Sequence, residues 1–136
     1  MNRKIEREII VLSLYSLEFT DNDIYDIAHY VLEQKKVSQP ATDYILNSIN
    51  GVVDNKEQID ELIISKLENY KIDRLSYLDL AIIRFATYEL LYNQDIPYAI
   101  VINEAIELTK KNSDLGDHKA TAFNNRLLDK IKMAIM

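Results

Sequence analysis

The sequence contains no cysteine and no tryptophan, and it has two glycines and two prolines among 136 residues. The lack of cysteine excludes a disulfide framework and thiolate chemistry, and it fits a reducing cytoplasm. Scarce glycine and proline disfavour strands joined by tight turns, which need these residues. No apolar run approaches the ~20 residues that cross a membrane, and the charged first eight residues do not resemble a signal peptide. We therefore expect a cytoplasmic, helical protein.

Basic residues are scarce as well, and the formal net charge is −6. This balance argues against non-specific binding of nucleic acid. The two ends of the chain are nevertheless basic: residues 1–7 carry a local +2 and residues 110–136 a local +3, whereas residues 8–109 carry −11. Either this distribution is chance on a solvated surface, or it confines phosphates to the two ends.

Apolar residues recur at helical spacing along the chain and predict a compact, all-α domain of seven helices over residues 1–136. The helix near 76–92 is apolar almost all round, so we expect neighbours on several sides and the deepest burial there. The expected helices run approximately over 3–19, 23–36, 38–53, 54–69, 76–92, 97–111, and from 118 or 121 to near the C-terminus.

Several short signals indicate where these helices begin and end. Ser76-Tyr77-Leu78-Asp79 and Asp54-Asn55-Lys56-Glu57 both have the spacing of helix caps. Pro40 and Pro97 suit a first helical turn, where the missing N–H costs nothing. Asn50-Gly51 either ends a helix or marks a close approach of two helices, and the sequence leaves both possibilities open.

Residues suited to catalysis or metal binding are few. Zinc sites draw on cysteine and histidine, and the chain has His29 and His118 alone. A di-iron bundle needs paired Glu-x-x-His motifs, whereas the sequence has one Asp26-x-x-His29. Serine-nucleophile motifs and glycine-rich phosphate loops are missing. We predict no enzymatic activity, no metal and no cofactor, with His29 satisfied or solvated and His118 capping a helix or exposed.

Arg84 interrupts the apolar helix near 76–92 and is expected to be partly buried. An isolated buried charge is costly, so Arg84 needs a carboxylate partner. The candidates are Glu89, Glu104 and Asp79. We predict a structural ion pair that joins this helix to the next one, rather than a ligand contact.

Lys4, Arg7 and Tyr15 share one face of the first helix. Cations along the backbone and aromatic rings beneath the bases are the usual means of binding single-stranded RNA. The alternative interpretation of Tyr15 is an amphipathic residue at the edge of the core.

The segment Asp79 to Lys111 closely resembles the NusB family, whose members carry a similar [L/I]-R-x-A-x-Y-E-L block, then a proline, then I-N-E-A-[I/V]-E-L-[A/T]-K. The basic first helix, the Leu14-Tyr15 pair and the closing helix are also similar to that family. The matching residues are Ile83-Arg84, Ala86, Tyr88-Glu89-Leu90, Pro97, Ile102 to Leu108, Lys119, Phe123, Asn125 and Leu127 to Ile131.

The resemblance implies a fold of two roughly perpendicular three-helix bundles. It also implies binding of the single-stranded boxA element of ribosomal RNA leader transcripts, together with the small-subunit ribosomal protein NusE. Such a complex joins RNA polymerase and suppresses termination. Together with the basic ends of the chain, the resemblance predicts six RNA-binding residues: Arg3, Lys4, Arg7, Tyr15, Lys119 and Phe123.

Three departures from the family pattern affect these expectations. The N-terminus has fewer arginines, and Tyr70 stands where a tryptophan is common. In the closing helix, the family's K-F-x-N-G-x-L corresponds to Lys119 followed by Phe123-Asn124-Asn125-Arg126-Leu127, with Ala120-Thr121-Ala122 between them. This difference is either a three-residue insertion or a shifted register.

Two other functions remain open: a protein-only adaptor that keeps the NusE-type contact, and a fragment of a ribosomal RNA cytosine methyltransferase. The chain end at Met136, without a catalytic domain, disfavours the second.

Overall fold

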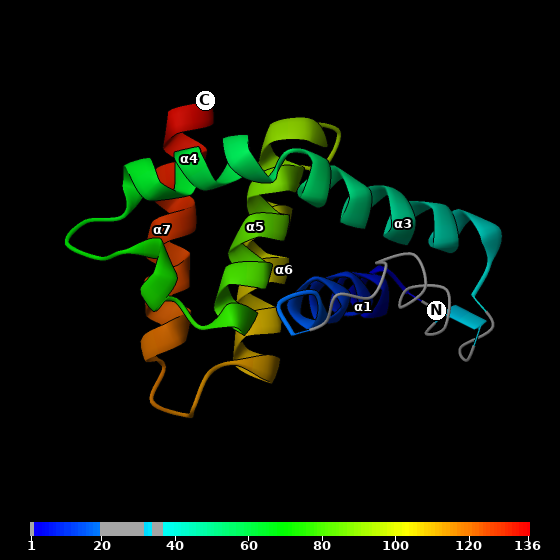
Figure 1. The fold of residues 1–136 in the computed structure, drawn as a ribbon, viewed down its shortest axis with the longest axis horizontal. Coiled ribbons are helices and arrows are strands. Elements are labelled where there is room, and N and C mark those ends of the chain that lie inside the picture. Colours follow the sequence, from blue (N-terminus) through cyan, green and yellow to red (C-terminus); the bar gives the residue numbers. More distant parts are fainter. Residues whose placement is uncertain (1, 20–31, 34–36) are drawn as a thin grey trace.

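The computed structural model describes residues 2–19, 32–33 and 37–136. These residues form six α-helices and one short 3-10 turn, without a strand among them (Figure 1). The all-α prediction is confirmed, whereas the helix expected over 23–36 lies almost entirely outside the described residues. The elements are α1 (Arg3–Ser16), α3 (Gln39–Asp54), α4 (Lys56–Lys66), η1 (Ile72–Arg74), α5 (Tyr77–Tyr92), α6 (Tyr98–Asn112) and α7 (Lys119–Ile135).

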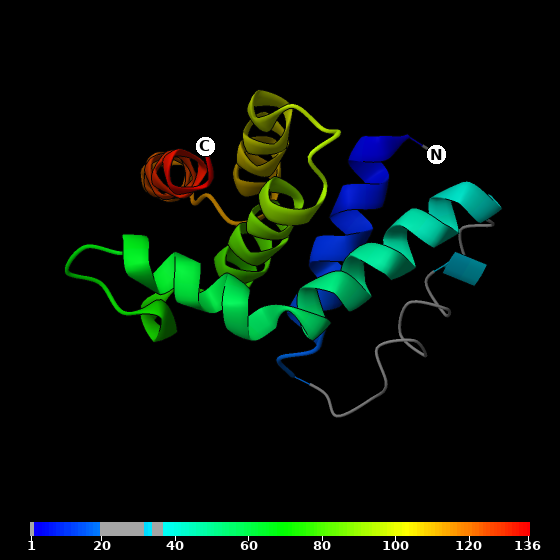
Figure 2. The same cartoon turned by 90° about the horizontal axis from the view of Figure 1, so that it is seen from above.

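Two groups of helices meet at α5. Helices α5, α6 and α7 pack against one another as a three-helix bundle. Helices α1 and α3 pack together and against α5, and they run across that bundle (Figures 1 and 2). Helix α4 follows α3 directly and contacts both α5 and α7. The crossing arrangement expected from the resemblance is therefore present in the described helices.

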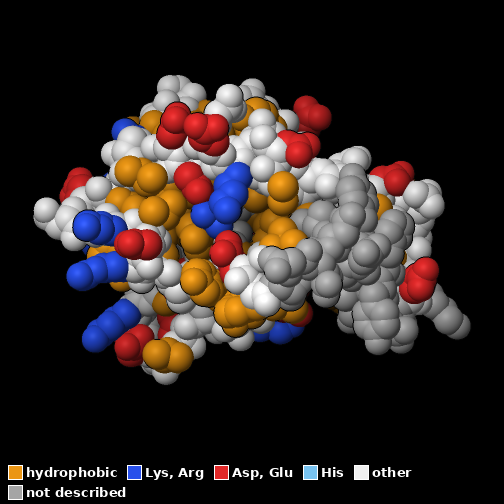
Figure 3. All heavy atoms as spheres, in the orientation of Figure 1, with side chains coloured by type: hydrophobic (Ala, Val, Ile, Leu, Met, Phe, Trp, Pro, Cys, Tyr) orange, Lys and Arg blue, Asp and Glu red, His pale blue; other side chains and the backbone are white. Residues whose placement is uncertain are grey.

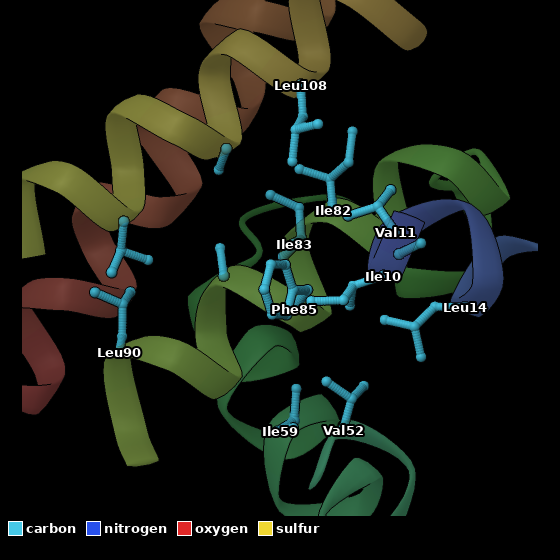
Figure 4. Close-up of a cluster of buried hydrophobic side chains, with 14 of the residues drawn as sticks. Ile10, Val11, Leu14, Val52, Ile59, Ile82, Ile83, Phe85, Leu90 and Leu108 are labelled. Carbon is cyan, nitrogen blue, oxygen red and sulfur yellow. The ribbon is translucent and has the colours of Figure 1, made fainter. Parts of the chain in front are cut away.

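Helix α5 contributes more buried residues than any other described helix, nine of its 16. Its Ile83 and Leu90 are fully enclosed. Figure 4 shows Phe85 of α5 beside Ile10 of α1, within a cluster to which α3, α4 and α6 also contribute. The prediction that this helix is the most buried is confirmed, and its physical basis is that neighbours cover it on several sides.

Three of the four predicted signals lie at helix starts: Ser76 caps α5, Pro40 lies in the first turn of α3, and Pro97 occupies the N-cap position of α6. Ser38 and Ser76 cap α3 and α5, and the Ser76 hydroxyl accepts a hydrogen bond from the Asp79 N–H at 3.0 Å. The capping box expected over Asp54 to Glu57 is wrong. Asp54 is the last residue of α3, and the Asn55 side-chain amide donates back to the Gly51 carbonyl at 2.8 Å, so it does not cap α4.

Gly51 lies inside α3 rather than at its end. A Cβ at this position would collide with the aromatic ring of Tyr88 on α5. Of the two interpretations that the sequence left open, the close approach of two helices is therefore correct. The missing side chain lets α3 pass directly over α5.

None of the helices within the described ranges combines the length and the apolarity that a bilayer-spanning segment needs.

Candidate nucleic-acid interface

The exposed cations at the start of α1 are partly matched by carboxylates. The Arg3 guanidinium lies 3.6 Å from the ring centroid of Tyr44, and its Nη1 is 3.4 Å from the Glu6 carboxylate. Lys4 lines a groove between α1 and α6, whose other lining includes Glu104 and Glu107. Half of the Arg3 side chain remains accessible, so it can still meet a phosphate while it rests on the Tyr44 ring.

Arg7 points into the protein, and its predicted place on an exposed face is wrong. Its side chain is 7% exposed, and its Nε lies 3.4 Å from the carboxylate of Glu89, which is 2% exposed. The same carboxylate accepts hydrogen bonds from the Tyr44 hydroxyl at 2.9 Å and from the Asn93 amide at 3.4 Å. Burial, reinforced by the charge on Glu89, raises the pKa of the Tyr44 phenol. Because Glu89 is itself buried on α5, it needs a cation, and Arg7 supplies it.

Arg84 is paired, but the partners predicted for it are wrong. Its guanidinium donates two hydrogen bonds of 2.8 Å to Asp60 on α4 and one of 3.1 Å to Glu18. Glu89 is five residues further along α5, which places it about 140° around the helix, facing α1 and α3. The other two candidates lie elsewhere: Glu104 lines the groove with Lys4, and Asp79 bonds to Ser113 and Asn124.

An aromatic row follows the end of α1 and reaches the start of α5. The row consists of Tyr15, Phe19 and Tyr77, and its rings meet edge to face with centroids 4.9 Å and 5.4 Å apart. Phe19 is 59% exposed and Tyr77 50% exposed, whereas Tyr15 is half-buried. The sequence analysis identified Tyr15 but missed Phe19, although their four-residue spacing places both on one helical face. The contact with Tyr77 could not be inferred from spacing.

The start of α7 lies at the same end of α5. Asp79 accepts hydrogen bonds from Ser113 at 2.6 Å and from the buried Asn124 of α7 at 3.1 Å. Tyr77, two residues earlier, touches the end of α1 through Phe19. The first residues of α5 therefore join the aromatic row to the start of α7, where Lys119 is exposed.

The closing helix, α7, starts at Lys119. The residues Ala120-Thr121-Ala122 belong to the first turns of α7, and Phe123 packs half-buried against Tyr70 with ring centroids 5.3 Å apart. His118 stands exposed at the N-cap position with a φ of 62°, and its side chain makes no cap hydrogen bond. His29 lies outside the described residues.

Asp114 caps α7 in place of His118. Its carboxylate accepts hydrogen bonds from the backbone N–H groups of Gly116, His118 and Thr121, and from the Thr121 hydroxyl at 2.5 Å. Led by the Thr121 hydroxyl, these bonds lower the pKa of Asp114 to about 2. Within the first turn of α7, the N–H groups of Lys119 and Thr121 are thus held by protein carboxylates, those of Asp117 and Asp114.

The stability that Asp114 contributes is expected to depend on pH. Its pKa is lower in the folded state than the 3.8 of an ordinary aspartate, so the contribution is present above pH ~4 and is lost as the pH falls towards 2. We expect the difference in unfolding midpoint between the wild type and Asp114→Ala to shrink steadily between these values in urea titrations. Asp95→Asn, which alters an exposed carboxylate before α6, serves as the control. A constant difference down to pH 2 would contradict the assignment.

The described residues contain no cluster of three potential metal ligands. They present an aromatic row with two exposed rings, nearby cations, and a buried Arg7–Glu89 ion pair in the interior. Exposed rings beside cations are typical of surfaces that bind a partner or a nucleic acid.

Comparison with known proteins gives the family. A model of the NusB family matches residues 4–133. The transcription antitermination protein NusB of Clostridium perfringens is 38% identical over 133 residues, which cover 96% of both chains. That of Bacillus subtilis is 36% identical over 135 residues, 99% of this chain and 98% of the relative. The chain belongs to the NusB family of transcription antitermination proteins.

Solved structures agree with this assignment. A T. maritima NusB structure superimposes with a TM-score of 0.89 at 33% identity, covering 98% of this chain and 92% of the other. A crystal structure of the antitermination factors NusB and NusE in complex with double-stranded RNA contains a chain with a TM-score of 0.85 at 28% identity. That match covers 97% of this chain and 96% of the other.

Proposed function

We propose that this protein is a transcription antitermination factor that binds boxA-type single-stranded RNA of ribosomal RNA leader transcripts together with the ribosomal protein NusE. In this role it joins the RNA polymerase antitermination complex in the cytoplasm, without catalysing a reaction. The observation that carries the proposal is its similarity over nearly the full chain to antitermination proteins, one of which has been crystallised with NusE and RNA.

The surface at the start of α5 supports binding of single strands. Phe19 and Tyr77 expose their rings, and bases that are free of a duplex can stack on them. We propose Arg3, Lys4, Tyr15, Lys119 and Phe123 as further RNA contacts. Arg7 is excluded from this set because it is buried against Glu89. Only three of these proposed contacts, Arg3, Lys4 and Lys119, are cations, so affinity at this surface must depend strongly on stacking and on the partner protein.

The test of the function is a titration of boxA-type RNA with and without NusE, beside a scrambled single strand and the duplex form of the same sequence. We expect NusE to tighten binding, and the boxA-type single strand to bind most strongly. Equal affinity for boxA-type and scrambled RNA in the presence of NusE would contradict boxA recognition. Preference for the duplex would contradict recognition by stacking.

The aromatic row and the cations are expected to respond differently to salt. Tyr77→Ala should weaken RNA binding by a similar factor at every salt concentration, with ~1–3 kcal/mol lost for a stacked base. Lys4→Gln should weaken it and also flatten the salt dependence by about 0.7 in log–log slope, because one phosphate contact is lost. Tyr77→Phe keeps the ring and is the matched control. A loss with Tyr77→Phe as large as with Tyr77→Ala would rule out stacking.

The protein-only adaptor remains the second candidate, and one observation favours it. Ile5 and Leu12 of α1 and Phe19 just beyond its end are spaced by seven residues and are all more than 40% exposed. Together they form an apolar stripe suited to a protein partner. NusE binding without any RNA binding, alone or in the complex, would select this function over the first.

A further inference from the structure

A cluster of cations surrounds the point where the end of α4 faces α7. It consists of Lys66 at the end of α4, Lys71 and Arg74 in the segment before α5, and Arg126 and Lys130 on α7. We call it the α4–α7 corner. Figure 3 shows Lys and Arg side chains projecting from the edge of the molecule where Figure 1 places α7 and the segment that follows α4.

Most cations of the corner are available to a ligand. Within the described part of the chain, Lys66, Lys71, Arg74 and Arg126 take part in no ion pair, whereas Lys130 lies 3.1 Å from Glu68. Elsewhere, most described cations are matched by carboxylates, as in the pairs Lys111–Glu8 and Arg84–Asp60. Three carboxylates lie among the five cations of the corner: Glu68 pairs with Lys130, Asp129 lines one of the hollows, and Asp73 is exposed next to Arg74. The corner therefore keeps a positive balance on an otherwise acidic protein.

The corner is hollowed and contains two aromatic rings. Two adjoining hollows share Lys66, Glu68 and Lys130, and one of them is also lined by Phe123 and Arg126. Tyr70, which is 41% exposed, packs against Phe123, and its hydroxyl donates to the Arg74 carbonyl at 3.3 Å. Cations beside partly exposed rings in a groove are the features with which proteins track a single-stranded nucleic acid.

The corner is continuous with the start of α7. Lys119, Phe123, Arg126 and Lys130 follow one another at intervals of four, three and four residues, so they lie on one face of that helix. A strand held at Lys119 and Phe123 would meet Arg126 and Lys130 next. The exposed Lys71 and Arg74 follow Tyr70, which packs on Phe123 and bonds to the Arg74 carbonyl, so they lie near the same face.

We propose that the α4–α7 corner is a second RNA-binding surface, which takes the backbone of the strand as it continues beyond the start of α7. The inference rests on the proposed function and extends its RNA path to residues of α4, α7 and the segment between α4 and α5. Paired rings and a hollow favour RNA over an acidic protein, for which cations alone would suffice.

The test compares RNA of two lengths, bound in the presence of NusE by the wild type and by Arg74→Gln/Arg126→Gln. These two arginines are exposed, so the variant should fold normally, which thermal unfolding verifies. We expect the wild type to bind a boxA-type RNA extended to about twice its length at least fivefold more tightly than the short one. The variant should lose that gain and keep its affinity for the short RNA. Its salt slope on the long RNA should fall by about 1.4, for two lost phosphate contacts.

Lys110→Gln/Lys132→Gln is the matched control, because it removes the same charge from residues held in their own pairs with Glu107 and Asp129. An equal loss with this control, or equal affinity of the variant and the wild type for the long RNA, would overturn the inference and leave the proposed function standing. So would a wild type that gains nothing from the longer RNA. Weakened NusE binding with unchanged RNA binding would overturn it in favour of a protein partner. A wild type that binds neither RNA would contradict the proposed function itself, and the inference that rests on it.

Discussion

Replacement of Glu89 by glutamine is expected to lower the free energy of unfolding by ~3–5 kcal/mol, because it leaves the Arg7 guanidinium buried without a counter-charge. The substitution keeps the size of the side chain and an oxygen that can accept from the Tyr44 hydroxyl, so the loss reports on charge rather than on packing. Urea unfolding followed by circular dichroism measures it.

The double variant Arg7→Met/Glu89→Gln distinguishes the contribution of the ion pair from that of side-chain packing around it. It removes both charges and fills the space of Arg7 with an apolar side chain, so it should recover most of the stability lost in the single variant. A loss below ~1 kcal/mol in Glu89→Gln would mean that the Arg7 cation is reached by solvent. No recovery in the double variant would mean that Arg7 stabilises the fold through packing of its methylene groups rather than through its charge.

Phe85→Ala is expected to cost a similar amount, ~3–5 kcal/mol, through lost burial and the cavity left behind. Phe85 is 3% exposed and lies where α1, α4 and α5 meet, so no neighbour can easily fill the space. Leu115→Ala, at a side chain that is 92% exposed, is the control and should change stability by less than ~0.5 kcal/mol. Comparable losses in the two variants would contradict the assigned core.

The helical framework was readable from the sequence because it depends on local signals. Apolar spacing located each described helix, and its continuity around residues 76–92 identified the central one. Ser76 marked a helix start through a hydrogen bond with a residue three positions later, and the two prolines did so through their fixed backbone angle and missing N–H. Gly51 was different, because the decision between a helix end and a close approach depended on Tyr88, 37 positions later in the chain.

The partners of buried charges could not be read in the same way. Periodicity places Arg7 and Tyr15 on neighbouring parts of one helix, but it does not reveal that a buried Glu89 turns Arg7 inward. It shows that Arg84 needs a carboxylate, but Asp60 and Glu18 reach it from α4 and from beyond the end of α1. For the same reason the sequence identified Tyr15 of the aromatic row but not Tyr77, which reaches the row from another helix.

The spacing of Lys119, Phe123, Arg126 and Lys130 has a geometric consequence for α7. Eleven residues separate Lys119 from Lys130, and an α-helix makes about three full turns and rises about 16.5 Å over that length. Lys130 therefore returns to nearly the same azimuth as Lys119. The three cations and the ring of Phe123 consequently form a straight row parallel to the axis of α7 rather than a spiral around it.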